Sequence, residues 1–263
     1  MAMIKVNDIN MHYEIRGSGP NVLFIHGLGA DLKNPISIFK TAVPEHFTVL
    51  AFDPRGLGET DKPPEPFGIA DMAADAAGLA SALGWNRYHL IGVSMGGMVA
   101  QELAIRFPER VDKLVLASTH TGVNSGAADV LGKMSRMTTL ERLYTSDTRQ
   151  DEAWAAANPE AVTRFEEESR AVMEAMTANP EAARAYQHQL AAAMAHDTLD
   201  RINLIKSRTL VISGRFDGSI PPEVARKMAE KIPSADFKLV DHGHGSWYFD
   251  PQVWDMVIEF LEA

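Results

Sequence analysis

The sequence contains no cysteine, and this absence excludes several kinds of chemistry. Without cysteine, the chain forms no disulfide, binds no metal through thiolates and has no cysteine nucleophile. No apolar run approaches the roughly 20 residues that span a bilayer, so we expect no membrane insertion. The first residues, Met-Ala-Met-Ile-Lys-Val-Asn-Asp, also lack the apolar region of a signal peptide, which favours a cytoplasmic location.

Positive charge is in deficit. The 25 Lys and Arg residues are outnumbered by 35 Asp and Glu residues, so the formal net charge is -10. Phosphate binding needs a basic footprint, and this balance therefore argues against nucleic acid as a partner. The acidity is typical of a chain kept soluble by its charge. With 263 residues, of which 46% are hydrophobic, the chain is long enough for a full-sized globular core.

Short runs that are apolar at nearly every position recur along the chain and indicate buried strands. After an alternating stretch typical of a hairpin (4–15), such runs occupy 22–25, 48–52, 90–93, 114–117, 209–212 and 237–240. Helical patterns lie between or after them, at 69–83, 95–107, 224–232 and 253–261. Strands buried on both faces and alternating with helices belong to parallel sheets that helices cover on both sides. We therefore predict an α/β fold with a doubly wound, mostly parallel sheet of eight strands.

One long segment departs from this alternation. Residues 121–200 carry no buried strand signal and are rich in Ala, Glu, Met and Arg. Within them, Asn158-Pro159-Glu160 and Asn179-Pro180-Glu181 are typical of helix starts, because proline suits the first position of a helix. We predict a core formed by 1–120 and 201–263, with 121–200 as a helical insertion.

A Gly-x-Ser-x-Gly motif, Gly92-Val93-Ser94-Met95-Gly96, stands between a predicted strand and a predicted helix. In such a nucleophile elbow the serine lies on a turn so tight that only small residues fit two positions before and after it. The N-terminus of the following helix directs free N–H groups at the reacting oxygen. Because strand and helix are both present, the motif predicts Ser94 as a nucleophile rather than a glycine-rich turn without chemistry.

Together with the turn His26-Gly27-Leu28-Gly29 and the stretch from Phe52 to Pro63, this elbow resembles the α/β-hydrolase superfamily, in its serine-nucleophile branch. The resemblance covers 4–118 and 205–261. It implies the α/β-hydrolase fold, with the insertion as a helical cap. It also implies an oxyanion hole made by the backbone N–H groups of Leu28 and Met95, each worth about 3 kcal/mol in the transition state. His26 is expected to shape its turn and not to act as the base.

The resemblance also implies an acid and a histidine after the nucleophile in the chain. Asp217, after the strand at 209–212, falls at the position of the acid. His242 and His244 compete for the base, and we choose His244 because a Gly-His pair followed by Asp-Pro matches the family pattern. Some hydrolases take the acid from the preceding strand, but here that strand leads into Ser118-Thr119-His120, which has no carboxylate and so favours Asp217.

The cap is expected to form the roof of the pocket and to select the substrate. Methionine adapts to irregular cavities, so the predicted pocket residues are Met134, Met137, Leu140, Leu143, Met173, Met176 and Met194, with Trp247 and Tyr248 near the base. Ordinary core packing is the alternative for all of them. We predict no cofactor, because the turn at 26–29 lacks the Gly-x-Gly-x-x-Gly spacing. We predict no metal either, since the pair His242 and His244 has no ligand cluster nearby.

The elbow and the helix after it are similar to those of small carboxylesterases and 3-oxoadipate enol-lactonase-like proteins. This resemblance implies hydrolysis of a small-molecule carboxylic ester or lactone by Ser94, His244 and Asp217 through an acyl-enzyme. A serine in the elbow argues against haloalkane dehalogenases and epoxide hydrolases, whose elbows carry aspartate. Two alternatives stay open: hydrolysis of a C–C bond in a dienoate of the meta-cleavage product type, and a ligand receptor on the same fold with little turnover.

Overall fold

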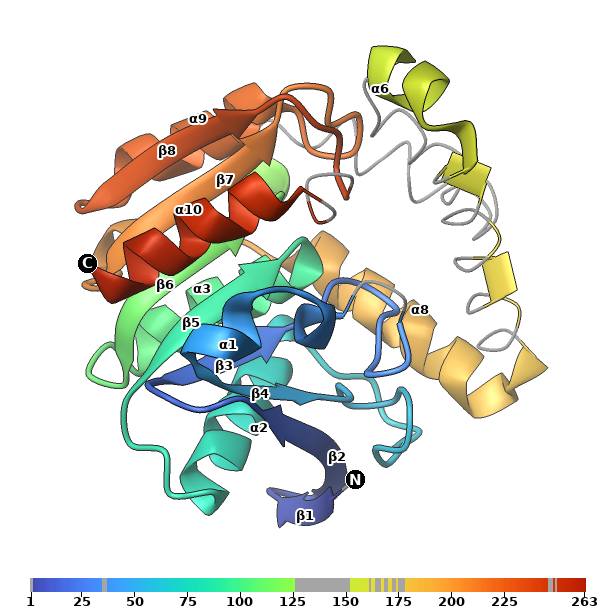
Figure 1. The fold of residues 1–263 in the computed structure, drawn as a ribbon. Helices are drawn as coiled ribbons and strands as arrows, with labels where there is room; N and C mark the ends of the chain where they lie inside the picture. The colour runs from blue at the N-terminus through green and yellow to red at the C-terminus, as the bar shows by residue number, and fades with distance from the viewer. Residues whose placement is uncertain are drawn as a thin grey trace.

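The computed structural model describes residues 2–34, 37–125, 152–160, 178–245, 248 and 250–263, together with 162, 163, 167, 170, 171 and 174. Within these residues, eight strands form a single sheet in the order β1-β2-β4-β3-β5-β6-β7-β8 (Figure 1). The strands are β1 (Ala2–Val6), β2 (Ile9–Arg16), β3 (Asn21–Ile25), β4 (Thr48–Phe52), β5 (Tyr88–Val93), β6 (Val111–Ala117), β7 (Arg208–Gly214) and β8 (Ala235–Val240). The sheet is mixed, because β1 and β2 pair in antiparallel fashion and β3 to β8 run parallel. The predicted mostly parallel α/β sheet is confirmed.

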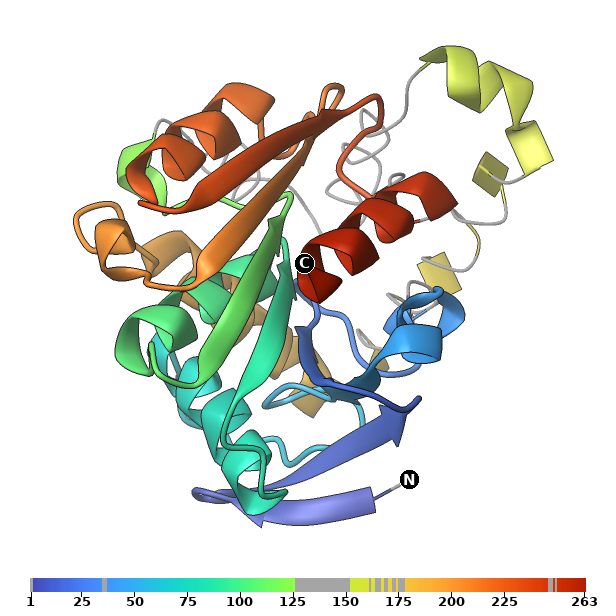
Figure 2. The same cartoon turned by 60° about the vertical axis from the view of Figure 1, so that its left-hand side comes forward.

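Helices cover both faces of the sheet (Figure 2). One face packs against α2 (Ile69–Ala82), α3 (Met95–Arg106) and α9 (Pro222–Lys231), and the other against α1 (Val43–His46) and α10 (Pro251–Glu262). Strand β3 shows why its sequence is apolar throughout. Leu23 and Ile25 belong to the first core layer, whereas Val22 and Phe24 belong to the second. Side chains alternate between the faces of a strand, so burial on both faces requires an unbroken apolar run.

Strand β8 is less buried than its sequence predicts. Among the described residues it forms an edge of the sheet and pairs only with β7. Phe237, Leu239 and Val240 are partly buried, while Asp236 and Lys238 between them are exposed. The expectation of a fully buried strand at 237–240 was therefore wrong. The charged side chains are typical of an edge strand, where they oppose pairing with another chain.

The segment between β6 and β7 contains the described helices α6 (Glu152–Ala157) and α8 (Pro180–Ala195). Helix α8 begins as predicted, because the side chain of Asn179 accepts hydrogen bonds from the backbone N–H groups of Glu181 and Ala182. Short 3-10 helices complete the described structure, at Ile38–Lys40, Val123–Ser125 and Ile202–Leu204. In the described part of the chain no helix is long and apolar enough to cross a membrane. The division into a core and a cap stays a prediction.

Candidate active site

Ser94 lies on a strained turn between β5 and α3. Its φ is 54° and its ψ is -122°, in a region that residues other than glycine seldom adopt. The backbone N–H of Ser94 donates to the carbonyl oxygen of Ala117 on the neighbouring strand, at 2.9 Å. Because such strain persists only where the surroundings impose it, the conformation of Ser94 points to a functional residue.

The two glycines of the elbow are required by close backbone approaches. A Cβ atom at Gly92 would lie 2.5 Å from the carbonyl oxygen of Gly96 and 2.7 Å from Cβ of Ala100. A Cβ atom at Gly96 would overlap the carbonyl oxygens of Ile25 and His26. The steric reason expected from the sequence therefore holds, and it ties the elbow to the end of β3.

The structure brings Ser94, His244 and Asp217 together from three separate loops. Nε2 of His244 lies 3.1 Å from Oγ of Ser94, and Nδ1 of His244 lies 2.9 Å from Oδ2 of Asp217. The Asp217 side chain is fully buried, and its Oδ1 accepts hydrogen bonds from the backbone N–H groups of Ser219 at 2.9 Å and Ile220 at 2.7 Å. In this arrangement a carboxylate can hold the imidazole with its proton on Nδ1, which leaves Nε2 able to accept the serine proton.

His242, the competing histidine, is engaged elsewhere. Its Nε2 lies 2.8 Å from Oδ2 of Asp250. Asp250 is also the N-cap of α10, where its side chain accepts a hydrogen bond from the backbone N–H of Gln252. The contact between His242 and Asp250 thus links the start and the end of the loop that carries His244. Of the two histidines, the structure brings His244 to Ser94.

The loop after β3 carries Leu28, one of the two predicted oxyanion donors. Leu28 and Met95 both line the same cavity as Ser94. Two buried side chains anchor this loop: the N–H of Gly29 donates to Oε1 of Gln189 on α8 at 3.1 Å, and the N–H of Leu32 donates to Oδ1 of Asp53 at 2.7 Å. The position of the Leu28 backbone therefore depends on segments far from it in the sequence.

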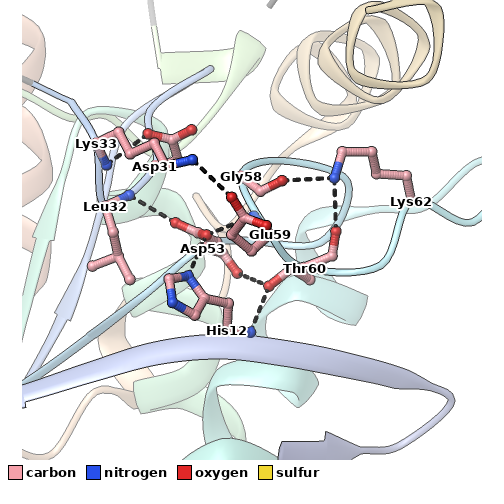
Figure 3. A network of polar contacts seen from close by, with 9 residues as sticks. All are labelled: His12, Asp31, Leu32, Lys33, Asp53, Gly58, Glu59, Thr60 and Lys62. Atoms are coloured by element: carbon pink, nitrogen blue, oxygen red, sulfur yellow. Dashed lines mark hydrogen bonds and ion pairs between the residues drawn. The ribbon is translucent and has the colours of Figure 1, made fainter. Parts of the chain in front are cut away.

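Asp53 is the centre of the polar network in Figure 3. This residue is 1% exposed. Its Oδ2 lies 2.7 Å from Nδ1 of His12 on β2 and accepts a hydrogen bond from the N–H of Glu59 at 2.8 Å. A buried carboxylate is stable only when hydrogen bonds or charges replace its hydration. The sequence showed Asp53 only as part of a family stretch, whereas the structure shows that it joins β2, the loop after β3 and the loop after β4.

Residues 20–251 match the family model described as alpha/beta hydrolase fold. The chain belongs to the α/β-hydrolase family. As a member of that family it is a hydrolase that acts on a small molecule.

The names of similar proteins refer to different reactions. This hydrolase is 28% identical to the poly(3-hydroxyalkanoate) depolymerase of Ectopseudomonas oleovorans, over 92% of this chain and 84% of that protein. It is 29% identical to the 2-hydroxy-6-oxononadienedioate/2-hydroxy-6-oxononatrienedioate hydrolase of Burkholderia vietnamiensis, over 97% and 91% of the two chains. The enol-lactonase of Burkholderia xenovorans LB400 shares the fold, with a TM-score of 0.80 over 100% of both chains at 24% identity.

The hydrolase has a cavity of about 60 Å³ beside Ser94 and His244. Apolar side chains form most of its wall, namely Leu28, Met95, Met98, Leu190, Ala193, Met194 and Ile220, with His120 and Ser219 as the other polar members. Met194 was among the predicted pocket residues. Met98 lies one helical turn after the elbow, and His120 follows the carboxyl end of β6, where ligands bind in open α/β sheets. Both positions can be located in the sequence, since one follows the elbow and the other follows the end of a predicted strand.

Most of the other predicted pocket residues belong to parts of the chain that the structure does not describe. Met134, Met137, Leu140, Leu143, Met173, Met176 and Trp247 lie outside the described residues. Tyr248 is described and is 6% exposed. Its ring packs edge-to-face on Trp254 of α10, with the ring centroids 4.9 Å apart. Tyr248 is thus a core residue of the second layer, and the expectation that it borders the pocket was wrong.

His26 is buried beside the site. Burial lowers the pKa of its imidazole to about 4, so the ring is neutral at pH 7. The ring contacts Phe24 edge-to-face, with the centroids 4.8 Å apart. These contacts agree with a structural role at the start of the loop after β3, as the family resemblance implied.

Proposed function

We propose that this hydrolase cleaves a small carboxylic ester or lactone through an acyl-enzyme formed on Ser94. The observation that carries the proposal is the 3.1 Å distance between Oγ of Ser94 and Nε2 of His244, with Nδ1 of the same ring held by buried Asp217. A serine hydroxyl is a weak nucleophile by itself and needs an adjacent base that is in turn oriented by a third group. Here Ser94 is the nucleophile, His244 is the adjacent base and Asp217 is the group that orients it.

In the proposed reaction, Oγ of Ser94 attacks the scissile carbonyl carbon while its proton passes to Nε2 of His244. The backbone N–H groups of Leu28 and Met95 donate to the oxyanion of the tetrahedral intermediate. The C–O bond to the alcohol then breaks, and His244 returns the proton to the leaving oxygen. Water repeats the sequence on the acyl-enzyme, and the products are the acid and the free Ser94 hydroxyl.

The wall of the cavity favours an uncharged ester over a dicarboxylate. The described residues that line it include neither arginine nor lysine. A dienedioate, the substrate class in the name of the Burkholderia vietnamiensis relative, carries two carboxylates that a buried site must neutralise. Hydrolysis of a C–C bond is therefore the second candidate. A receptor without turnover is disfavoured because an inert serine needs no imidazole within hydrogen-bond distance.

The proposal is tested with p-nitrophenyl esters of increasing acyl length and with lactones followed by pH-stat, on wild type and on Ser94→Ala. We expect kcat/KM of the variant to fall by about 10³-fold or more. Ser219→Ala is a matched control, because this serine lines the same cavity but has no proposed role in bond cleavage. Equal ester activity in wild type and Ser94→Ala would refute the proposal.

A second pair of measurements separates the alternatives. A fluorophosphonate probe should label wild type stoichiometrically and leave Ser94→Ala unlabelled, whereas a receptor with an inert serine would stay unlabelled in both. Turnover of a vinylogous diketo acid without ester activity would instead establish the C–C hydrolase. The cytoplasmic location stays a prediction from the sequence.

A further inference from the structure

His120 lines the same cavity as Ser94 and His244, yet the proposed ester hydrolysis does not use it. It stands three residues after the end of β6, and Ser118 between them has a φ of 47°. A side chain other than glycine in this region is strained, which identifies the turn after β6 as a second special backbone conformation at the site. His120 itself is 1% exposed.

The hydrogen bonds of His120 determine which ring nitrogen carries the proton. Its Nδ1 accepts a hydrogen bond from the backbone N–H of Gly122, at 2.9 Å. Burial lowers the pKa of this imidazole to about 4, so the ring is neutral at pH 7. A neutral imidazole has one donor nitrogen and one acceptor nitrogen. Because Nδ1 is the acceptor, Nε2 is the donor.

The backbone that carries this ring is held from two other elements. The carbonyl oxygen of His120 accepts a hydrogen bond from Nε2 of Gln101 on α3, at 3.1 Å. Oε1 of the same Gln101 accepts a hydrogen bond from the hydroxyl of Thr198, at 2.6 Å. Gln101 and Thr198 are both 0% exposed. A side chain fixed in this way presents its donor in one place, as binding sites require.

The Nε2–H donor of His120 is not used within the described part of the protein. Among the described residues, Nε2 of His120 has no hydrogen-bond partner. His120 lines the cavity, and most of the cavity wall is apolar, so the wall offers few acceptors to this N–H group. An acceptor atom on a ligand in this cavity would satisfy it.

We propose that Nε2–H of His120 donates a hydrogen bond to a second oxygen of the substrate, other than those of the scissile ester group. The substrate class is then an ester or lactone that carries a keto, hydroxyl or ether oxygen near the bond to be cleaved. This inference rests on the proposed ester hydrolysis and specifies its substrate. The donor recognises an oxygen on either the acyl or the alcohol side of the ester, and the two sides are separated by experiment.

The test compares esters in which one CH₂ group is replaced by an oxygen atom. On the acyl side, p-nitrophenyl pentanoate is compared with p-nitrophenyl 3-methoxypropanoate and ethoxyacetate. On the alcohol side, butyl acetate is compared with 2-methoxyethyl acetate by pH-stat. The quantity measured is the ratio of kcat/KM for the oxygen-containing ester to that for its all-carbon partner. Comparison of this ratio between variants cancels the intrinsic reactivity of each ester.

Two substitutions separate the donor from the structural role of the ring. His120→Asn keeps an acceptor for the N–H of Gly122 but has no donor at the position of Nε2. We expect it to lower the ratio of kcat/KM by about tenfold on one side of the ester. The ratio is taken within each variant, so a general effect of the substitution on turnover cancels. His120→Gln extends an amide N–H toward the position of Nε2 and should restore most of the ratio.

Several results would overturn the inference. The first is an unchanged ratio in His120→Asn for both ester series, and the second is an equal loss for oxygen-containing and all-carbon esters. Calorimetric binding of the same esters to Ser94→Ala, with and without His120→Asn, gives the comparison without turnover. Absence of ester turnover in wild type contradicts the proposed function. Equal binding of oxygen-containing and all-carbon esters to Ser94→Ala contradicts the role of His120.

Discussion

Acidification from pH 7 to pH 5 should strongly destabilise this hydrolase. Burial lowers the pKa of His26, His120 and His196 to about 4. In the unfolded chain a histidine has a pKa of about 6.5. At a pH between about 4 and about 6.5, the unfolded chain takes up protons at these three side chains and the folded chain does not. The free energy of unfolding therefore falls as the pH drops below about 6.5, and the loss is complete below about pH 4.

The size of the effect follows from the same values. One histidine with a folded pKa of about 4 and an unfolded pKa of about 6.5 loses about 2 kcal/mol of stabilisation between pH 7 and pH 5. Three such side chains lose roughly 5 to 6 kcal/mol, which approaches the total stability of many domains.

Urea unfolding at pH 7, 6 and 5 and constant ionic strength measures this loss. His120→Asn, which keeps the acceptor for Gly122, should reduce the loss between pH 7 and pH 5 by about 2 kcal/mol. His46→Gln is the control, because the side chain of His46 is 42% exposed and stays in contact with water in the folded chain. A free energy of unfolding that does not change between pH 7 and pH 5 would refute the reasoning, as would the same pH dependence in His120→Asn and wild type.

Three further substitutions test the contacts that position the site. Gly96→Ala places a Cβ against backbone carbonyl oxygens, so we expect a loss of about 2 kcal/mol in unfolding free energy and at least 100-fold in ester kcat/KM. Asp53→Asn turns one of the two carboxylate oxygens that accept from the N–H groups of Leu32 and Glu59 into a donor, and it should cost about 3 kcal/mol in urea unfolding. Gln189→Leu removes the acceptor of the Gly29 N–H and should lower kcat more than it raises KM, with about 1 kcal/mol lost in stability.

Each of these variants has a control with the same chemical change outside the site. A Cβ at Gly68 would make only an ordinary van der Waals contact, since the nearest atom, on Asp71, is 3.7 Å away, so Gly68→Ala should cost much less than Gly96→Ala. Asp61→Asn changes a partly exposed carboxylate, and Gln187→Leu changes an exposed residue of α8. A site variant that behaves like its control shows that the contact in question does not position the site.

The features that the sequence predicted correctly are those that depend on neighbours in the chain. The run Val22-Leu23-Phe24-Ile25 identifies a strand buried on both faces because side chains alternate across a strand. The elbow around Ser94 is recognisable because its strain is local, and glycine must stand at 92 and 96 wherever that turn occurs. The N-cap at Asn179 is local for the same reason.

Burial along β8 could not be predicted in this way. Its apolar residues resemble those of the central strands, but in the part of the chain that the structure describes β8 pairs with a strand on one side only. Which strand ends at an edge depends on the order in which distant segments pair. A run such as 237–240 carries no information about that order.

The sequence by itself, with the resemblance that its motifs carry, determined the α/β sheet, the elbow and the residue types of the site. Only the tertiary structure decided that His244 lies beside Ser94 while His242 pairs with Asp250. It likewise decided that Asp53 and Gln189 hold the loop of Leu28, and that His120 lines a mostly apolar cavity. The physical reason is that these contacts join residues up to 160 positions apart, so they exist only after the sheet has assembled and packed.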